Sequence, residues 1–252
     1  MTSTSITTKS AIQDLVKNVV STGFFDKIKV TSSTKEVLIE ALGREKEVVF
    51  KGVLSRPVDG LEGEFGLNNL GLLGHIVGDS DFANTDSTLN VVYESRNNQK
   101  VPTELSYQNR SKSQIMYRFM AAQMVPPQPK FIEPTWDVVI KPTKVSVQQF
   151  SWAASGLSNY EQYFIPKVVD KELKFFIGDE TSANQRGAVT FATAVTGKLD
   201  STHKWRINNV LSVLKLIDST ECTLSFSQQG VIQAAINTGV GEYKFIFLAK
   251  AR

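Results

Sequence analysis

The sequence has very little of the chemistry on which most enzymes depend. Its 252 residues include one cysteine, Cys222, and two histidines, His75 and His203. A single cysteine excludes an intramolecular disulfide, and these three residues lack the spacing of a zinc site. No glycine-rich phosphate loop, dinucleotide-binding fingerprint or nucleophile elbow occurs. We therefore predict that the protein is not an enzyme, that it uses no cofactor or metal, and that Cys222 is a core residue.

Long apolar runs and a strong charge imbalance are also missing. No stretch approaches the ~18 consecutive apolar residues of a membrane span, and the start of the chain lacks the basic segment and apolar run of a signal peptide. We therefore expect a soluble, cytoplasmic protein. The net charge of +3 is too small to indicate nucleic-acid binding from bulk charge, so any basic surface has to be local.

Alternation of apolar and polar residues, the pattern of half-buried strands, runs through most of the chain. It predicts ten strands: Lys35–Leu42, Lys46–Leu54, Leu89–Ser95, Ser113–Met120, Trp136–Lys141, Leu173–Gly178, Gly187–Val195, Cys222–Phe226, Val231–Asn237 and Tyr243–Ala249. Turn-forming residues such as Asn97-Asn98 and Gln229-Gly230 separate them. The protein is therefore predicted to be rich in β-structure.

Four segments have helical spacing instead. They are Lys9–Thr22, Leu67–Val77, Ser146–Leu157, with Ser146 as its cap, and Lys204–Ile217. The interval between the starts of the first two, from Lys9 to Leu67, equals the interval between the starts of the last two, from Ser146 to Lys204. This repeated spacing indicates a duplicated unit of helices and strands. The fold class is therefore predicted to be α+β, with two similar β-rich domains that each contain two helices.

A proline-rich stretch lies between the two halves. Residues 121–134 contain four prolines, which cannot lie inside a sheet and indicate an extended connector. We predict an N-terminal domain over residues 1–122, a connector over 123–134 and a C-terminal domain over 135–252.

The predicted helices are poor in carboxylates. They contain five basic residues (Lys9, Lys17, Lys204, Arg206 and Lys215) and one acidic residue, Asp14; the third helix has no basic residue. A surface that keeps lysine, arginine, glutamine and asparagine but avoids carboxylates suits weak, sequence-independent contact with a phosphate backbone. The alternative interpretation is that six charged residues are too few for this bias to indicate a function.

The order of these elements resembles that of the DNA sliding clamps, in detail those of T-even-type phages. Three stretches carry the resemblance: residues 14–28, DLVKNVVSTGFFDKI; residues 65–81, FGLNNLGLLGHIVGDSD; and the C-terminal part from Arg206 to Ala249. The resemblance implies a homotrimeric ring that encircles duplex DNA, non-specifically, and tethers the replicative DNA polymerase for processive synthesis. It also implies a clamp loader as a partner, no membrane, and a location in the host cytoplasm.

The resemblance further assigns two sets of residues. Helix residues that would face DNA are Lys9, Gln13, Lys17, Gln148, Arg206, Asn209 and Lys215. Residues that would line an apolar pocket for a partner peptide are Met124, Val125 and Pro126 of the connector and Leu248 of the last strand.

Two other hypotheses stay open at this point. A β-rich virion or other structural protein would also lack catalytic motifs, although four amphipathic helices at duplicated spacing argue against it. A single-stranded-DNA-binding protein would interleave aromatic and basic residues on exposed strands, as Tyr117-Arg118-Phe119 does.

Overall fold

The computed structural model describes residues 5–54, 56–96, 99–178, 185–219 and 221–250. Within them the chain forms two compact units. Unit 1 contains the residues up to Lys46 together with Phe50–Pro129 and Thr238–Tyr243, and unit 2 contains Glu47–Val49, Lys130–Asn237 and the residues from Lys244 onward. Strands β4 (Val48–Leu54) and β17 (Gly241–Leu248) therefore contribute residues to both units.

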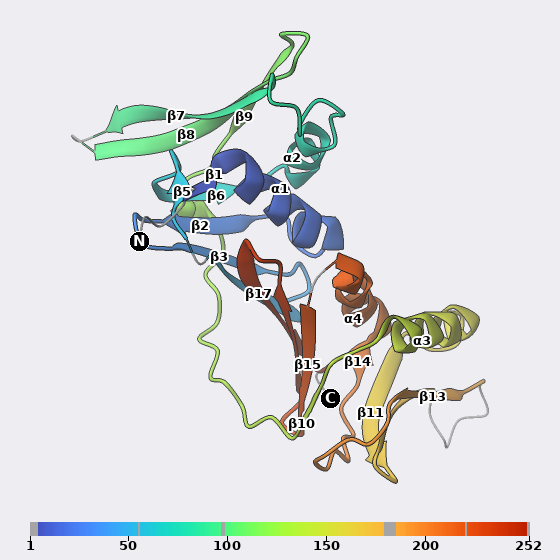
Figure 1. Ribbon diagram of the computed structural model, residues 1–252. Coiled ribbons are helices and arrows are strands. Elements are labelled where there is room, and N and C mark those ends of the chain that lie inside the picture. The colour runs from blue at the N-terminus through green and yellow to red at the C-terminus, as the bar shows by residue number, and fades with distance from the viewer. Residues whose placement is uncertain (1–4, 55, 97–98, 179–184, 220, 251–252) are drawn as a thin grey trace. The chain divides into compact units, whose positions relative to one another are not determined.

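Unit 1 combines antiparallel sheets, a short parallel pair of strands, β1 and β5, and two helices. Its elements are β1 (Ile6–Thr7), α1 (Thr8–Asn18), β2 (Ile28–Ser32), β3 (Val37–Leu42), β5 (Val58–Asp59), β6 (Gly63–Leu67), α2 (Leu70–Val77), β7 (Thr88–Arg96), β8 (Gln99–Gln108) and β9 (Gln114–Arg118). One set of neighbouring strands runs β4-β3-β2-β6, and a separate sheet runs β7-β8-β9. Helices α1 and α2 pack against each other (Figure 1).

Unit 2 has the same kind of organisation. Its elements are β10 (Val138–Ile140), α3 (Lys144–Leu157), β11 (Tyr163–Val169), β12 (Glu172–Ile177), β13 (Gly187–Ala192), β14 (Trp205–Arg206), α4 (Ile207–Leu214), a 3-10 turn (Lys215–Ser219), β15 (Glu221–Ser227) and β16 (Val231–Asn237). Strand order is β10-β15-β16-β17 in one part and β13-β12-β11-β14 in the other. Helices α3 and α4 pack against each other (Figure 1).

Aromatic clusters fill both cores. In unit 2 the ring of Phe175 lies 4.9 Å from that of Phe150, 4.7 Å from Phe164 and 4.3 Å from Phe191, and all four side chains are at most 3% exposed. Such rings bury roughly 150–250 Å² each and favour tilted or edge contacts. Helix α3 contributes only Phe150 to this cluster, and the strands supply the rest. The aromatic contacts therefore fix helix α3 against its sheet and leave its opposite face exposed.

The helices confirm the predicted pairs, with shifted bounds. They begin at Thr8, Leu70, Lys144 and Ile207, so the intervals within the two pairs differ by a single position. Thr7 caps α1 by accepting from the Ser10 amide, and the turn after α1 ends at Gly23, where φ is +74°. In α2 the buried residues are Leu70, Leu73 and Ile76.

The predicted start and cap of the third helix were wrong. Thr143 is the N-cap, and its side chain and that of Ser146 form a reciprocal capping box. The helix therefore begins at Lys144, ahead of the predicted start at Ser146, and the prediction that this helix has no basic residue was wrong as well.

All ten predicted strands are present, and four longer ones were missed: β2, β6, β8 and β11. The connector forms a short 3-10 turn at Ala122–Met124, and residues 125–135 have no regular secondary structure. The chain passes from unit 1 to unit 2 between Pro129 and Lys130. The domain limits at residues 122 and 135 stay a prediction.

Candidate nucleic-acid interface

One carboxylate is present in the four described α-helices, and it points into unit 1. The Asp14 carboxylate accepts hydrogen bonds from the Tyr243 hydroxyl at 2.6 Å, the Thr238 hydroxyl at 3.0 Å and the Asn18 amide at 3.0 Å. Acidic residues make up 25 of the 252 residues of the chain. The exposed side chains of these α-helices nevertheless include no carboxylate, so an approaching phosphate meets no fixed negative charge on these faces.

Helix α1 has an exposed polar row. Ser10, Gln13 and Lys17 are all exposed and recur at positions i, i+3 and i+7, which places them on one side of the helix. Ala11, Ile12 and Leu15 are buried on the other side. Of the predicted DNA-facing residues, Gln13 and Lys17 are therefore available to a ligand.

The two helices of unit 2 bring basic residues to a shared hollow. Lys144 and Gln148 of α3 line it together with Lys215, the residue that follows α4, and its volume is about 200 Å³. All three side chains are exposed. Two ammonium groups beside one hollow attract an anion more strongly than either does alone, and salt weakens this attraction. Gln148 and Lys215 belong to the predicted DNA-facing set, and Lys144 does not.

Arg206 and Asn209, which were predicted to face DNA, both contact Glu47. The Arg206 guanidinium lies 3.0 Å from a Glu47 carboxylate oxygen, and the Asn209 side-chain amide donates to the same oxygen at 3.3 Å. Arg206 also lies over the Tyr163 ring. Glu47 offsets the charge of Arg206 in this half-buried polar contact within unit 2.

Lys9 also binds its own chain. Its Nζ donates to the Asn84 carbonyl at 2.7 Å and to the Ser87 hydroxyl and carbonyl at 2.7 and 3.2 Å, above the Phe82 ring. An ammonium has three hydrogens, and these contacts use all of them. Desolvation lowers the pKa of Lys9. Lys9, which was predicted to face DNA, therefore holds α1 against residues 84–87.

The four residues predicted for a partner-peptide pocket have different environments. Met124 is 61% exposed and Pro126 is exposed, whereas Val125 is 6% exposed and packs on Gly66. Leu248 is half-buried and belongs to unit 2, whereas the other three belong to unit 1. A pocket formed by these residues stays a prediction.

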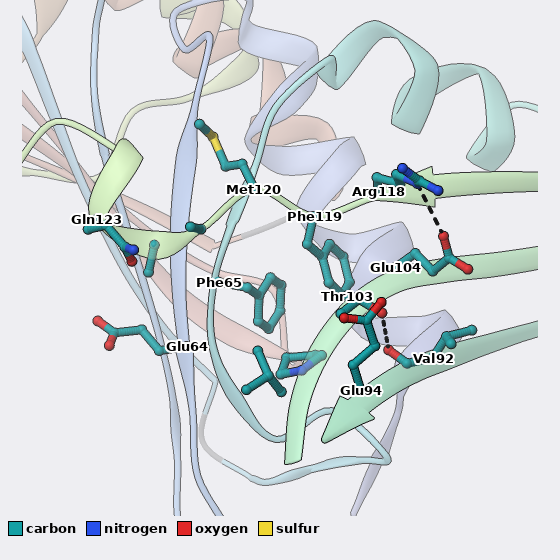
Figure 2. A pocket seen from close by; sticks show the side chains of 14 residues that line it. Glu64, Phe65, Val92, Glu94, Thr103, Glu104, Arg118, Phe119, Met120 and Gln123 are labelled. Carbon is teal, nitrogen blue, oxygen red and sulfur yellow. Dashed lines mark hydrogen bonds and ion pairs between the residues drawn. The ribbon is translucent and has the colours of Figure 1, made fainter. Parts of the chain in front are cut away.

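A separate hollow of about 520 Å³ lies within unit 1, just before the connector (Figure 2). The rings of Phe65 and Phe119 stack at 4.2 Å in its wall. Carboxylates of Glu64 and Glu104 line it, and Glu104 lies 3.7 Å from Arg118 (Figure 2). Its lining is mainly polar, unlike the apolar pocket predicted nearby.

The residues that could have indicated another function have structural roles or surroundings that do not fit it. Tyr117 is buried, and its hydroxyl donates to the Asn68 carbonyl, so Tyr117-Arg118-Phe119 is not a platform for nucleobases. Cys222 is buried as predicted, and burial raises its pKa to about 12. Within the described residues, no cluster of three or more histidine, cysteine or acidic residues could hold a metal ion. No described helix has the length and apolar character needed to cross a membrane.

Comparison with known proteins finds similarity in fold but not in sequence. Neither a protein-family model nor a curated protein matches the sequence. Solved structures do match. PCNA from Thermococcus kodakaraensis has a TM-score of 0.69 at 13% identity, over 97% of this chain and 98% of that chain. The fold is that of a DNA sliding clamp.

Two further clamp structures agree over nearly the whole chain. A. fulgidus PCNA, solved with the C-terminal region of FEN-1, has a TM-score of 0.69 at 10% identity and covers 98% of each chain. A PCNA2–PCNA3 complex from Sulfolobus tokodaii has a TM-score of 0.67 at 10% identity, over 95% of this chain and 97% of that chain. The predicted α+β clamp fold, with two β-rich parts that each hold two helices, is thus confirmed.

Proposed function

We propose that this chain is the subunit of a sliding clamp, which encircles duplex DNA and tethers the replicative DNA polymerase during processive synthesis. The observation that carries the proposal is a set of helices without exposed carboxylates in a chain with the clamp fold. Encirclement does not require strong contacts, and weak exchangeable contacts with phosphates permit sliding. In this proposal the protein is a scaffold and not an enzyme.

The ring is proposed to be a homotrimer. Three chains with two helix pairs each would line the hole with helices and place the sheets outside. Pairing between sheet edges of neighbouring subunits would also cover strands that otherwise invite aggregation. Among the described strands, β9 pairs only with β8 and β13 pairs only with β12 in their sheets, so each is available at an edge.

The proposed DNA contacts are Lys17, Lys144 and Lys215, with Gln13 and Gln148 in support. The three lysines are exposed and lie on or directly beside the helices. Glutamine side chains donate hydrogen bonds to phosphates without adding charge. A helix surface with few basic residues and no exposed carboxylate would attract DNA phosphates without holding the DNA at one position.

The proposed protein partners are the replicative polymerase and a clamp loader, in a system of the T-even-type phage kind. Partner tails are proposed to dock at Met124, Val125, Pro126 and Leu248. Met124 is exposed beside prolines, and methionine adapts to different apolar partners. The clamp-fold neighbour from A. fulgidus was solved with a C-terminal peptide region bound, which is consistent with docking of tails on this fold.

Threading onto DNA tests encirclement without a loader. A duplex is fixed to a bead at one end, the protein is added, and the free end is then blocked with a bulky protein cap. We expect retention through a wash in high salt on blocked DNA, and loss from DNA whose end is left open. Salt removes electrostatic binding in both cases. Equal loss from blocked and open DNA would contradict encirclement.

A charge variant tests the proposed contacts in the same assay. Lys17, Lys144 and Lys215 are changed together to glutamine. We expect weaker and less salt-dependent association with DNA, because each lost phosphate contact reduces the slope of log affinity against log salt by roughly 0.9. The matched control is Lys46, Lys112 and Lys171 changed to glutamine, since these lysines are exposed but lie outside the helices. An equal effect of the control would contradict the assignment.

A further inference from the structure

Buried or half-buried residues recur at every third position from Ala122 onward. Ala122 is 8% exposed, Val125 is 6% exposed and Gln128 is half-buried, and the residues between these positions are exposed. The pattern outlasts the 3-10 turn at Ala122–Met124, which has the same period, and continues at positions 131 and 134. A strand repeats every two residues and an α-helix every 3.6, whereas a polyproline II helix has three residues per turn. The burial pattern therefore indicates a polyproline II segment over residues 125–129 of unit 1, with one face inward.

The backbone agrees with this assignment. Val125 has φ of −84° and ψ of 127°, close to the polyproline II values of about −75° and +145°. Proline fixes φ at about −65° at positions 126, 127 and 129. A following proline also restricts Val125, Pro126 and Gln128 to extended conformations. Sequence and structure therefore impose the same conformation on residues 125–129.

Two contacts hold the inward face against the strands of unit 1. The Gln128 side-chain amide donates to the Ala41 carbonyl of β3 at 2.7 Å and to the Phe50 carbonyl of β4. The Val125 side chain packs on Gly66 of β6, where a Cβ would lie 2.7 Å from it. The segment is thus fixed at two points three residues apart. The entropy of ordering it is therefore lost on folding and not on binding of a partner.

The other two faces of the segment are apolar and exposed. One face carries Pro126 and Pro129, and the other carries Pro127 and Met124, which is 61% exposed. Residues three apart share a face of a polyproline II helix, so the two faces form two parallel ridges. Rigid apolar ridges of this kind are what an aromatic-lined groove recognises by shape.

Pairing of this stretch with a partner strand is excluded by its lack of donors. Proline has no N–H group, which removes the donors at positions 126, 127 and 129. The Val125 amide already donates to the Ala122 carbonyl at 3.1 Å. At most one N–H, that of Gln128, is therefore left in residues 125–129. An aromatic-lined groove needs no ladder of such donors.

We propose that residues 124–129 are a preformed polyproline II ligand, which a partner protein reads with an aromatic-lined groove. In this arrangement the connector is the ligand and the partner supplies the pocket. The inference rests on the partner docking of the proposed function and deepens it, because it names the chemistry of the partner surface. In the set of docking residues Pro127 and Pro129 take the place of Val125, because Val125 faces the strands of its own unit.

Binding of a known reader of polyproline II tests the surface. The probe is an isolated WW domain of the class that reads Pro-Pro-x-Pro, a pattern that Pro126-Pro127-Gln128-Pro129 matches. The groove tryptophan of the probe is followed by NMR while the full-length chain is added. The same titration is run with a synthetic peptide of residues 121–131. We expect the chain to bind about threefold or more tighter than the peptide, because the folded protein holds the segment in its bound conformation.

Matched proline variants separate this surface from a general effect of proline. Pro126→Ala combined with Pro129→Ala removes one exposed ridge and should weaken binding at least about tenfold. Both prolines are exposed, so the far-ultraviolet spectrum should not change. The control is Pro57→Ala, because Pro57 is half-buried in unit 1 but lies outside the connector. Its effect on binding should stay below about twofold.

A third variant tests whether the segment is preformed. Gln128→Ala removes both hydrogen bonds to β3 and β4 but keeps every proline. We expect the affinity of this variant for the WW domain to fall to that of the free peptide. Wild-type affinity in Gln128→Ala would show that the two hydrogen bonds do not hold the segment ready and would overturn the preformed ligand.

The other outcomes are equally decisive. A wild-type chain that does not bind the WW domain, or binds it no more tightly than the peptide does, overturns the proposal. Equal binding by the wild type and the double proline variant also overturns it. Retention on end-blocked DNA separates this result from the function. If the chain binds the WW domain but is not retained, the clamp function fails and the polyproline II surface stands; if it is retained but does not bind, the surface fails and the function stands.

Discussion

Replacement of Tyr243 by phenylalanine tests how the acid of helix α1 is held inside unit 1. The Tyr243 hydroxyl donates to Asp14 at 2.6 Å, and the tyrosine is 0% exposed. Phenylalanine keeps the ring, so the main loss is one hydrogen bond to a carboxylate, worth about 1.5–3 kcal/mol. Thr238 and Asn18 still donate to Asp14. We therefore expect the loss of stability to lie near the lower end of that range.

The assay has to report on unit 1. The three tryptophans of the chain, Trp136, Trp152 and Trp205, all lie in unit 2, so tryptophan fluorescence follows the other unit. Hydrogen exchange of the α1 amides is the suitable measurement. Because about 1.4 kcal/mol is a factor of ten, protection of these amides should fall by about 10- to 30-fold in Tyr243→Phe.

A second measurement uses pH. Burial and the neighbouring Asp14 carboxylate raise the pKa of Tyr243. The folded protein therefore keeps the phenolic proton above about pH 10, where the unfolded chain releases it, so stability falls as pH rises beyond about 10. Tyr243→Phe should remove this part of the alkaline dependence.

Two results would refute the reasoning. Tyr160 is 55% exposed, and Tyr160→Phe should change the free energy of unfolding by less than about 0.5 kcal/mol; an equal effect of both variants would show that the contact with Asp14 is not responsible. A double-mutant cycle of Tyr243→Phe with Asp14→Ala should give a coupling of at least about 0.5 kcal/mol. Strict additivity would contradict the hydrogen bond.

Three further predictions concern packing and surface. Gly197 has φ of +104°, and a Cβ there would lie 2.0 Å from the Asp137 carbonyl oxygen, so Gly197→Ala should cost more than about 2 kcal/mol in a urea transition followed by tryptophan fluorescence. Cys222 is buried with a pKa of about 12, so it should react with a thiol reagent only after unfolding, and quick reaction in the native protein would contradict its burial. Lys9→Met should lower stability by about 1–3 kcal/mol because it removes three hydrogen bonds, and it should leave the salt dependence of DNA binding unchanged. Lys17→Met should leave stability unchanged and should reduce the salt dependence of DNA binding, because Lys17 is exposed.

Sequence patterns predicted the strands that alternate and missed those that contain breakers. Strand β8 includes Pro102, and strand β11 includes Pro166, which stands opposite Phe175 inside the sheet. Strand β6 contains two glycines, and Gly66 accommodates Met120 and Val125 where a Cβ would clash. Proline and glycine lower strand propensity, but tertiary contacts at these positions outweigh it.

The third helix shows how a local signal can be assigned to the wrong residue. Ser146 is a good capping residue, and the pattern of apolar residues starts with Val147. The preceding Thr143 is the first half of a capping box whose second half is usually glutamate or glutamine and here is the serine at position 146. Pro142 before it also indicates a chain turn. These signals taken together would have placed Lys144 on the helix.

The sequence indicated the kind of surface at the proposed interface, but not which of its residues are available to a ligand. Composition alone indicated helices without carboxylates, and the structure explains the single exception, because Asp14 is bonded to residues 238 and 243, at the other end of the chain. The same long-range contacts decide which cations stay available to a ligand. Glu47 lies far from Arg206 in sequence, and no periodicity links the two. The periodicity of a helix indicates which of its residues face the core. The charge that a ligand meets on the other face depends on whether a distant carboxylate or carbonyl already binds the lysine or arginine side chain. Lys9 and Arg206 bind carbonyl, hydroxyl or carboxylate groups of their own chain, whereas Lys17 and Lys215 are exposed. Mutation of Lys17 and Lys215 should therefore weaken DNA binding more than mutation of Lys9 and Arg206.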